Sequence, residues 1–548
     1  MKKVLVRKNT YVDSVFLMLI SRDLEKRQDV TSATVTMGTP MNIELLKNQG
    51  FNDPILSDAT AADLLLAVEC ADDKAIETVF QTAQEMLAQK HKKGDGALSQ
   101  EAPHSIVEAL EIIPTLNLAV ISLPGIYAAR ETRKALENDL HVMLFSDNVS
   151  LEDEIALKRI AHDKALLLMG PDCGTAIISG KPLCFSNIVA QGSVGIVAAS
   201  GTGLQEVTCL IDRFGAGVSQ AIGTGGRDLK NEKVGGLTMI TAIEALGADD
   251  STKVIVVISK PPAPEVARSV LDTLLTTGKP AVVHFIGLEI PDAPQGTLHW
   301  AKNLEETARF AVDLAENPLL HEIQSSDWPF NLPEHEIDMI ISNETKSMKD
   351  FQKYIRGYYT GGTLADEAWI LLHGLTGEVY SNNQVDPAYV LKDPKKSKGH
   401  TIVDLGDDIF TVGRPHPMID PSTRTERIEA ESEDPEIAVM LVDCVLGYGS
   451  HENPAGAMVP ALRAAKKSME ARGGYLSIIA SVTGTAEDTQ DFFKQVEILR
   501  NAGIIVMPSN YQASMLAVRI LEKIQGIDVS KQKNSQKKNF EKKPQAYK

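Results

Sequence analysis

The chain has 548 residues, of which 43% are hydrophobic and 23% charged, and its formal net charge is −18. This length exceeds what one hydrophobic core serves, so three to four domains are expected, and the globular composition argues against disorder as the default. The acidic balance argues against nucleic acid as the main partner, because binding a phosphate backbone requires a basic surface.

The first predicted unit spans residues 1–190. Residues 3–6 are predicted to form a buried strand and residues 12–20 a helix, and further strand-like apolar runs follow at 118–122 and 141–145. Short apolar runs that alternate with helical patterns are typical of parallel strands. We expect this unit to have a doubly wound α/β fold.

Two further units are predicted at 191–323 and 351–525, joined by a polar, proline-containing linker at 324–350. A lysine-rich tail at 526–548 lacks apolar periodicity and is expected to be disordered. The predicted strands of the two units lie at 194–198, 254–258, 281–285, 438–442 and 475–479. Continuously apolar strands separated by helices predict the doubly wound α/β class, in which ligands bind at the carboxyl ends of strands.

The second and third units carry the same elements in the same order. In each, a Gly-Thr turn precedes a helix with an acidic residue, Glu206 in one and Asp366 and Glu367 in the other. In each, an Asp-rich turn later introduces a strand. This matching order favours an internal duplication.

The two Gly-Thr turns are the main candidate site. Glycine permits a tight turn, and a helix start offers N–H groups and the positive end of the dipole, which together attract phosphate. The alternative is a capped helix start without a ligand. The predicted phosphate-binding residues of the turns are Ser200, Gly201, Thr202, Gly203, Gly361, Gly362 and Thr363.

Other glycine-bearing turns that follow strands extend the candidate site. Arg227 adds a cation that suits a phosphate. The Walker pattern and GxGxxG are absent, so neither a P-loop nor a dinucleotide site is indicated. The predicted residues of these turns are Gly447 and Gly449 for phosphate binding, and Asp172, Cys173, Gly225 and Gly226 in a substrate loop.

The segment DLGDDIFTVGRPHPMID at 404–420 supplies further candidates. Prolines flank His416, which is expected to titrate near neutral pH and to act as an acid or base. Arg414 suits bidentate contact with a carboxylate or phosphate, and Asp407 and Asp408 complete the predicted substrate loop. The alternative is a rigid loop in which Arg414 pairs with one of these aspartates.

The five cysteines form no CxxC pair, and no metal-ligand spacing such as HEXXH occurs. This pattern favours a reducing cytoplasm over a disulfide framework and predicts no metal site. No apolar run reaches the roughly 18–20 residues that a membrane span needs. We expect a cytoplasmic protein without membrane contact.

Several segments resemble succinyl-CoA synthetases. GPDCGTAI, VGIVAASGTGLQEV and KPAVVHFIG are similar to segments of the α subunit, and VDLGDD and VMLVDCVLGYG to segments of the C-terminal domain of the β subunit. Fused in one chain with TGGTLADEA and VDLGDDIFTVGRPHPMIDP, they resemble the FdrA family over about residues 1–520. The resemblance implies a CoA-binding-type Rossmann domain followed by two flavodoxin-like domains, whose Gly-Thr helix starts face a shared phosphate site.

The chain departs from the synthetases in three ways. The active histidine of the synthetases lies in a GHAGA segment; the corresponding stretch here, GLEIPDAPQGTLHWAKN, lacks that context although His299 is near. The glycine-rich CoA loop after the first strand is missing, and no ATP-grasp domain is recognised. The resemblance therefore implies an anion carried by the substrate and not a phosphohistidine.

FdrA-type proteins are linked to oxamate carbamoyltransferase, working with partner subunits. The resemblance thus implies transfer of a carbamoyl group between carbamoyl phosphate and oxamate or oxalurate, with Arg227 on the phosphate and Arg414 on the oxamate carboxylate. No cofactor is required, although the fold leaves room for CoA. Acyl-CoA ligation and a non-catalytic, anion-sensing scaffold are the alternatives, and a homo-oligomer is compatible with each.

Overall fold

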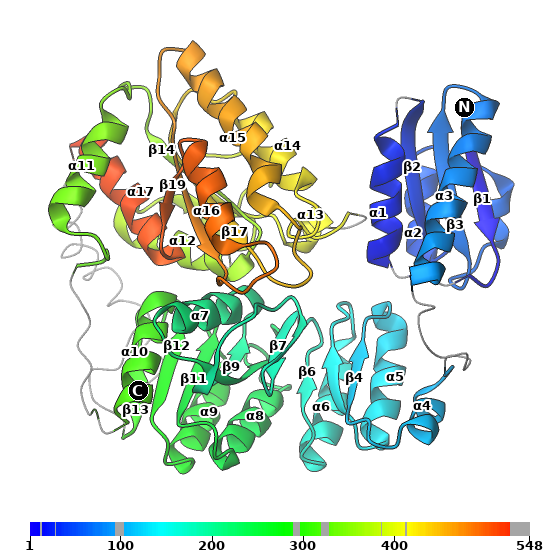
Figure 1. Ribbon diagram of the computed structural model, residues 1–548, viewed down its shortest axis with the longest axis horizontal. Helices are drawn as coiled ribbons and strands as arrows, with labels where there is room; N and C mark the ends of the chain where they lie inside the picture. Colours follow the sequence, from blue (N-terminus) through cyan, green and yellow to red (C-terminus); the bar gives the residue numbers. More distant parts are fainter. Residues whose placement is uncertain are drawn as a thin grey trace. The chain divides into compact units, whose positions relative to one another are not determined.

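The computed structural model describes residues 1–526 apart from 11, 13, 28, 94–102, 289–295, 319, 321–327, 385, 412 and 413. The predicted tail therefore lies outside the described residues, except for Gly526. In the described part of the chain, no helix is long and apolar enough to cross a membrane. Two compact units are distinguished, one of residues 1–103 with 411–415 and one of residues 104–410 with 416–548 (Figure 1).

Residues 1–103 form a small α/β unit with an antiparallel sheet of order β1-β3-β2. Its elements are β1 (Lys2–Arg7), α1 (Ser14–Glu25), β2 (Val30–Met37), α2 (Pro40–Asn48), η1 (Pro54–Asp58), β3 (Leu64–Cys70) and α3 (Asp73–Lys93). The strand at 3–6 and the helix near 12–20 are confirmed. A single Rossmann domain over 1–190 is wrong, because this sheet is antiparallel and belongs to a separate unit.

Residues 104–170 carry a short parallel sheet of order β4-β5-β6. Its elements are α4 (Ile106–Ile112), β4 (Leu118–Ile121), α5 (Gly125–Glu137), β5 (His141–Leu144), α6 (Leu151–Asp163) and β6 (Leu168–Met169). Met143 and Met169 pack into the same core as strands of the next sheet. This segment is therefore built onto the following domain.

The first ligase-type domain is a seven-stranded sheet of order β13-β12-β11-β9-β10-β7-β8. Its strands are β7 (Thr175–Ile178), β8 (Lys181–Cys184), β9 (Gln191–Ala199), β10 (Val218–Gly223), β11 (Val254–Ser259), β12 (Ala281–Phe285) and β13 (Leu298–Trp300). Its helices are α7 (Gly201–Arg213), α8 (Leu237–Ala248), α9 (Pro264–Thr276) and α10 (Leu304–Glu316). The strands from β9 to β13 run parallel, and β11 is wholly buried, as its apolar run predicts.

The second ligase-type domain has a parallel sheet of order β15-β16-β14-β17-β18-β19. Its strands are β14 (Tyr354–Tyr359), β15 (Val379–Tyr380), β16 (His400–Asp404), β17 (Ile437–Val445), β18 (Ser477–Thr483) and β19 (Ile505–Met507). Its helical elements are α11 (Glu334–Thr345), α12 (Gly362–Thr376), η2 (Pro387–Tyr389), α13 (Asp408–Thr411), α14 (Ser422–Glu431), α15 (Pro454–Ala471), α16 (Phe492–Asn501) and α17 (Asn510–Gln525). Helix α11 lies inside the predicted linker, because Ile337 and Ile341 form a buried i,i+4 stripe.

Both ligase-type sheets repeat one topology. When the antiparallel strands β7 and β8 of the first sheet and the two-residue edge strand β15 of the second are left aside, each sheet runs second, first, third, fourth, fifth in chain order: β10-β9-β11-β12-β13 and β16-β14-β17-β18-β19. This is the flavodoxin-like order, and the first strand of each sheet leads directly into the helix with the Gly-Thr start. The predicted fold class and the matching order of elements are confirmed.

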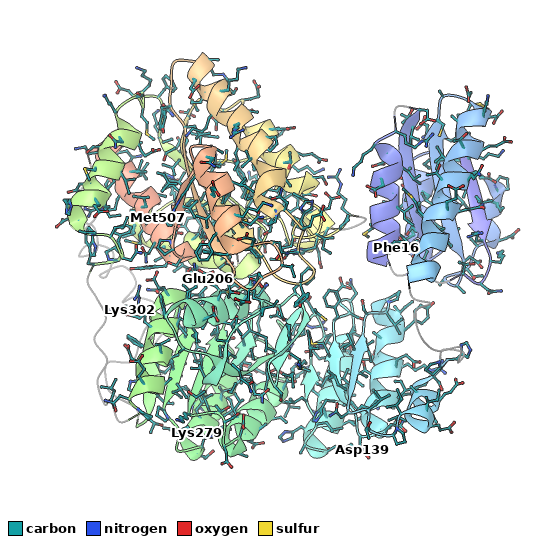
Figure 2. All side chains as sticks on the ribbon, in the orientation of Figure 1. Phe16, Asp139, Glu206, Lys279, Lys302 and Met507 are labelled. Carbon is teal, nitrogen blue, oxygen red and sulfur yellow. The ribbon has the colours of Figure 1, made fainter. Side chains whose placement is uncertain are left out.

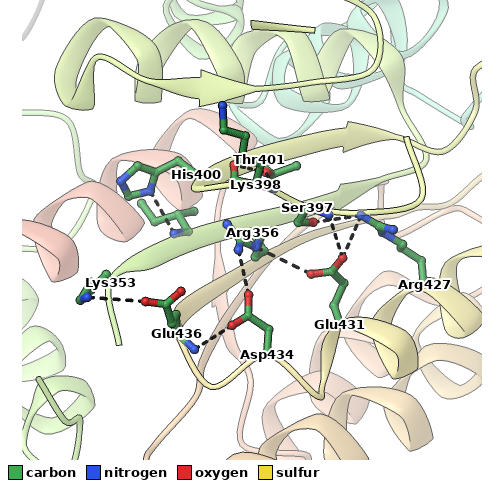
Figure 3. Close-up of polar contacts among 11 residues, drawn as sticks. Lys353, Arg356, Ser397, Lys398, His400, Thr401, Arg427, Glu431, Asp434 and Glu436 are labelled. Carbon is green, nitrogen blue, oxygen red and sulfur yellow. Dashed lines mark hydrogen bonds and ion pairs between the residues drawn. The ribbon is translucent and has the colours of Figure 1, made fainter. Parts of the chain in front are cut away.

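A buried ionic cluster stabilises the second ligase-type domain (Figure 3). Arg356 on β14 pairs with Asp434 at 2.9 Å and lies 3.8 Å from Glu431, which also pairs with Arg427. Two guanidinium groups thus face two carboxylates. Because the two positive charges balance the two negative charges, we interpret this cluster as a structural network and not as a binding site.

Candidate functional site

The two Gly-Thr helix starts meet. The hydroxyl oxygens of Ser200 and Thr363 are 2.6 Å apart, and the backbone N–H of Thr363 donates to Oγ1 of Thr202. A Cβ on Gly361 would lie 3.0 Å from the methyl group of Thr202. Helices α7 and α12 therefore converge at their N-termini, where the first N–H groups of a helix lack intrahelical acceptors.

Each helix start is held in a different way. Ser200 is the N-cap of α7, and its side chain accepts from the N–H of Gly203, as the capping alternative predicts. Gly361 is the N-cap of α12 and has no side-chain cap. The backbone before α12 is held by Asp443 on β17, whose carboxylate accepts from the N–H groups of Thr360 and Gly361.

A polar cluster that the sequence did not predict lies beside the start of α12. Lys260, directly after β11 of the first ligase-type domain, pairs with Asp366 of α12 at 2.5 Å. The amide of Asn383 donates to both Asp366 and Asp404 at 3.4 Å. Burial and the neighbouring carboxylate of Asp366 raise the pKa of Asp404 to about 7, although Lys260 opposes the shift. The site therefore combines residues of both domains.

Glycines allow the backbone to approach the Asp404 carboxylate. A Cβ on Gly362 would lie 2.5 Å from Oδ2 of Asp404, and a Cβ on Gly406 would lie 3.3 Å from Oδ1. The N–H of Gly406 donates to Oδ1. The carboxyl group thus lies directly against the first residue of α12. Glycine at 362 is required for this approach.

His416 lies next to the same loop. Its Nε2 would be 2.6 Å from a Cβ on Gly406, and its Nδ1 accepts from the N–H of Met418. Burial lowers the pKa of His416 to about 4, so the expectation that it titrates near neutral pH is wrong. A neutral ring whose Nδ1 accepts carries its proton on Nε2. His416 can therefore serve as a donor, and its catalytic role stays a prediction.

Asp172 and Asp408, two predicted residues of the substrate loop, lie within electrostatic reach of each other. Desolvation of its carboxyl group by the surrounding chain, together with Asp147 and Asp408, raises the pKa of Asp172 to about 6, whereas Arg227 and Lys260 lower it. Burial and neighbouring carboxylates likewise raise the pKa of Asp408. The structure thus groups these acids with the cations Arg227 and Lys260. Asp407 contributes to the raised pKa of Asp404 from the same loop.

Arg227 already has protein partners. Its Nε lies 2.7 Å from the buried Glu154, and it donates to the carbonyl of Val149. Glu154 also faces Lys158, which pairs with Asp228 at 2.7 Å. This network joins α6 to the loop after β10. Arg227 therefore has a structural role, and its contact with a phosphate remains a prediction.

Three of the remaining predicted glycines pack closely against neighbouring atoms. Gly447 and Gly449 have positive φ, and Cβ atoms there would meet the carbonyl of Ser186 at 2.6 Å and the ring of Phe185 at 2.7 Å. At Gly225, a Cβ would lie 2.3 Å from the carbonyl of Pro171, whereas Gly226 faces open space. The structure thus explains three of these glycines by packing, and phosphate binding at Gly447 and Gly449 stays a prediction.

Three further residues considered in the sequence lie apart from the two helix starts or have no demonstrated contact with them: Cys173, Arg414 and His299. Cys173 is buried, and burial raises the pKa of its thiol to about 12, which argues against a nucleophile. Arg414 is exposed and belongs to the segment 411–415 grouped with residues 1–103, so its contact with a substrate stays a prediction. His299 lies on the edge strand β13, and β12 and β11 separate that strand from β9, which leads into α7.

The same kind of hydrogen bond crosses the boundary between the two ligase-type domains twice, once from each domain. Glu206 of α7 accepts from the N–H of Asn510, the first residue of α17 in the other domain. Glu367, at the matching position of α12, accepts from the N–H of Leu304, the first residue of α10. Both carboxylates are buried, and Figure 2 labels Glu206 at this boundary. Each domain thus caps the last helix of the other.

This reciprocal contact predicts a pH-dependent stability. Burial raises the pKa of Glu367 to about 7, above its ordinary 4.5, so the folded state holds the proton more tightly than the unfolded chain. Its stabilising contribution is full below about pH 4.5 and is lost as the pH rises to 7. We expect Glu367 to lower the free energy of unfolding by about 2 kcal/mol between pH 5.5 and 8.

Urea unfolding of the full chain at both pH values measures this effect. In Glu367→Gln, the decrease in the free energy of unfolding should shrink by the same amount. An unchanged pH dependence in the variant would contradict the assignment.

Comparison with known proteins agrees with this architecture. The family model described as "CoA binding domain" matches residues 189–287, the one described as "CoA-ligase" matches 358–520, and "AllF, heavy metal-associated domain" matches 1–103. The CoA-binding match therefore falls on the first ligase-type domain and not on residues 1–190. Among the described residues, no group of three or more His, Cys, Asp or Glu could hold a metal ion.

The fold and these matches define a protein built from CoA-binding and CoA-ligase domains of the succinyl-CoA synthetase type. The chain is 46% identical over 521 residues to the uncharacterized protein YahF of Escherichia coli (strain K12), covering 94% of this chain and 98% of the relative. It belongs to the family of that protein.

More distant relatives share only part of the chain. The α subunit of succinate–CoA ligase [ADP-forming] from Staphylococcus epidermidis (strain ATCC 12228 / FDA PCI 1200) is 26% identical over 174 residues, 31% of this chain and 55% of the relative. The chain thus spans about half the length of that relative. Among solved structures, that of an acetyl-coenzyme A synthetase of Ca. Korarchaeum cryptofilum matches over 79% of this chain and 88% of that chain, at 15% identity and a TM-score of 0.30.

Proposed function

We propose that the chain is an acyl-CoA-ligase-type subunit that transfers an acyl group between phosphate and an acceptor thiol. The observation that carries the proposal is the meeting of the α7 and α12 N-termini beside Lys260, Asp366 and Asp404. Converging helix N-termini favour an anion such as phosphate, and the adjacent titratable groups suit proton transfer. The matches to CoA-binding and CoA-ligase models support this class of chemistry.

The phosphate is proposed to arrive on the substrate. His299, the histidine nearest to the synthetase segment, lies on the edge strand β13, away from β9 and α7. An acyl phosphate would need no phosphohistidine, since its acyl group is already activated by the phosphate that leaves. Electrostatic stabilisation of the leaving phosphate would then supply most of the rate.

The full chain is incubated with acetyl phosphate or succinyl phosphate, with and without CoA, and released phosphate is measured. We expect the unaltered chain to release phosphate only when CoA is present. The rate of release in His299→Ala should lie within threefold of the rate in the unaltered chain. Calorimetry should detect CoA binding. Absence of CoA binding, or a rate independent of CoA, would contradict acyl-CoA ligation.

Carbamoyl transfer is a second candidate, favoured by the acidic character of the site. Asp172, Asp404 and Asp408 offer carboxyl oxygens that accept hydrogen bonds from N–H groups, which carbamoyl phosphate and oxamate possess and thioesters lack. The resemblance to FdrA-type proteins also supports this reaction. It would be favoured if the chain released phosphate from carbamoyl phosphate only when oxamate is present. Release under neither condition would favour the third reading, an anion-sensing scaffold that organises other subunits.

A further inference from the structure

Asp404 is a buried carboxyl group of the candidate site. It ends β16, and it is 7% exposed. The charged and titratable groups that act on it come from three segments: Lys260 after β11, Asp366 of α12 and Asp407 in its own loop. His416 lies against the next turn through Gly406. The carboxyl group thus lies where both domains contribute charge.

Its hydrogen bonds leave Asp404 able to change protonation. The N–H of Gly406 donates to Oδ1 at 2.9 Å, and among the described residues the long 3.4 Å hydrogen bond from Asn383 is the one that reaches Oδ2. Lys260 lies 2.5 Å from Asp366 and so pairs mainly with that carboxylate. Oδ2, the weakly bonded oxygen, is also the atom that lies against Gly362 at the start of α12.

An anion at this helix start would act on Asp404 directly. Like charges disfavour each other at short range, so a phosphate at the α12 start would favour the protonated carboxyl group. A carboxyl group that titrates near neutral pH can both take and return a proton there. Neither Asp366, which is paired with Lys260, nor the neutral His416 is placed to do the same.

We propose that Asp404 is the residue that carries the proton during group transfer at the α7–α12 site. This inference rests on the proposed function. Asp404 is protonated when the acyl phosphate is bound. As the acceptor sulfur bonds to the acyl carbon and the carbon–oxygen bond to phosphate breaks, Asp404 gives its proton to the leaving phosphate, which departs as HPO₄²⁻. The Asp404 carboxylate then takes the thiol proton, so the side chain is protonated again at the end of the transfer.

The test uses the full chain and inorganic phosphate, the product. Phosphate binding is measured by calorimetry at pH 8 in two buffers that differ in ionisation enthalpy, which gives the number of protons taken up. We expect the unaltered chain to take up between a half and one proton on binding, and Asp404→Asn to bind phosphate with no uptake. The same variant should lose at least 100-fold in the rate of phosphate release from acyl phosphate.

Asp250→Asn is the matched control, because Asp250 is exposed in the turn before β11, at the opposite end of that strand from Lys260. It should leave proton uptake and rate unchanged. Unchanged uptake in Asp404→Asn, or a rate within threefold of the unaltered chain, would overturn the inference. If phosphate binds but no acyl phosphate reacts, the proposed reaction fails while the uptake measurement still decides the role of Asp404; if phosphate does not bind, both fail.

Discussion

Replacing Asp443 with alanine is expected to lower the free energy of unfolding by about 3–5 kcal/mol. Asp443 is fully buried on β17 and pairs at 2.8 Å with Arg424, which is also buried. Its carboxylate accepts from Thr360 and Gly361 as well. The variant would leave a buried guanidinium without its counter-charge and two N–H groups without an acceptor, which is the costly way to break such a network.

A double-mutant cycle separates the two losses. Urea unfolding of Asp443→Ala, Arg424→Met and the double variant should show that the double variant loses less than the sum of the single variants, because no charge is then left buried alone. Simple additivity, or a loss below about 1 kcal/mol in Asp443→Ala, would show that the pair does not hold the loop before α12.

The apolar strands of the ligase-type domains predicted their fold because these strands are covered on both faces. A run such as 254–258 has few interpretations other than an interior parallel strand. The fold of the N-terminal unit was predicted wrongly because a strand such as β2 is covered mainly on one face. In β2, the buried residues Ala33, Val35 and Met37 alternate with more exposed ones, the pattern of an antiparallel strand with one wetted face. That period of two is visible in the sequence of β2.

The site was predicted only where local backbone chemistry marks it. Gly-Thr before a helix is a local pattern, and it correctly located both helix starts. Lys260, Asp404 and Asp443 were missed because each is a single charged residue within or just after an apolar strand, and their meeting depends on sheet order. Charged residues at the carboxyl ends of consecutive buried strands were the available signal.

The repeated topology of the two ligase-type domains explains why the site lies at the domain boundary. Glu206 of the first ligase-type domain caps a helix of the second, and Glu367 of the second caps the matching helix of the first. The two domains are thus arranged so that equivalent parts of each face the other. The two Gly-Thr turns are such equivalent features, and they therefore meet. Lys260 and Asp404 break this equivalence, since one comes from each domain at non-matching positions. The asymmetric groups are thus the ones expected to determine the chemistry.

Gly362→Ala is expected to abolish phosphate binding at the α12 start. The new methyl group would lie 2.5 Å from Oδ2 of Asp404, well inside contact distance, so the carboxyl group or the helix start must move. Such overpacking costs about 1–3 kcal/mol of stability. The displaced backbone would no longer direct its N–H groups to the anion, and calorimetry should show at least a 30-fold loss of phosphate affinity.

The same substitution at Gly374 is the control, because this glycine lies in the same helix and a Cβ there would meet no atom within 4 Å. Removing a glycine from a helix interior gains about 0.5–1 kcal/mol, so Gly374→Ala should be more stable than the unaltered chain and bind phosphate equally well. The two variants differ only in what the added methyl group touches. Equal phosphate affinity in both would show that the start of α12 is a capped helix and not part of a binding site.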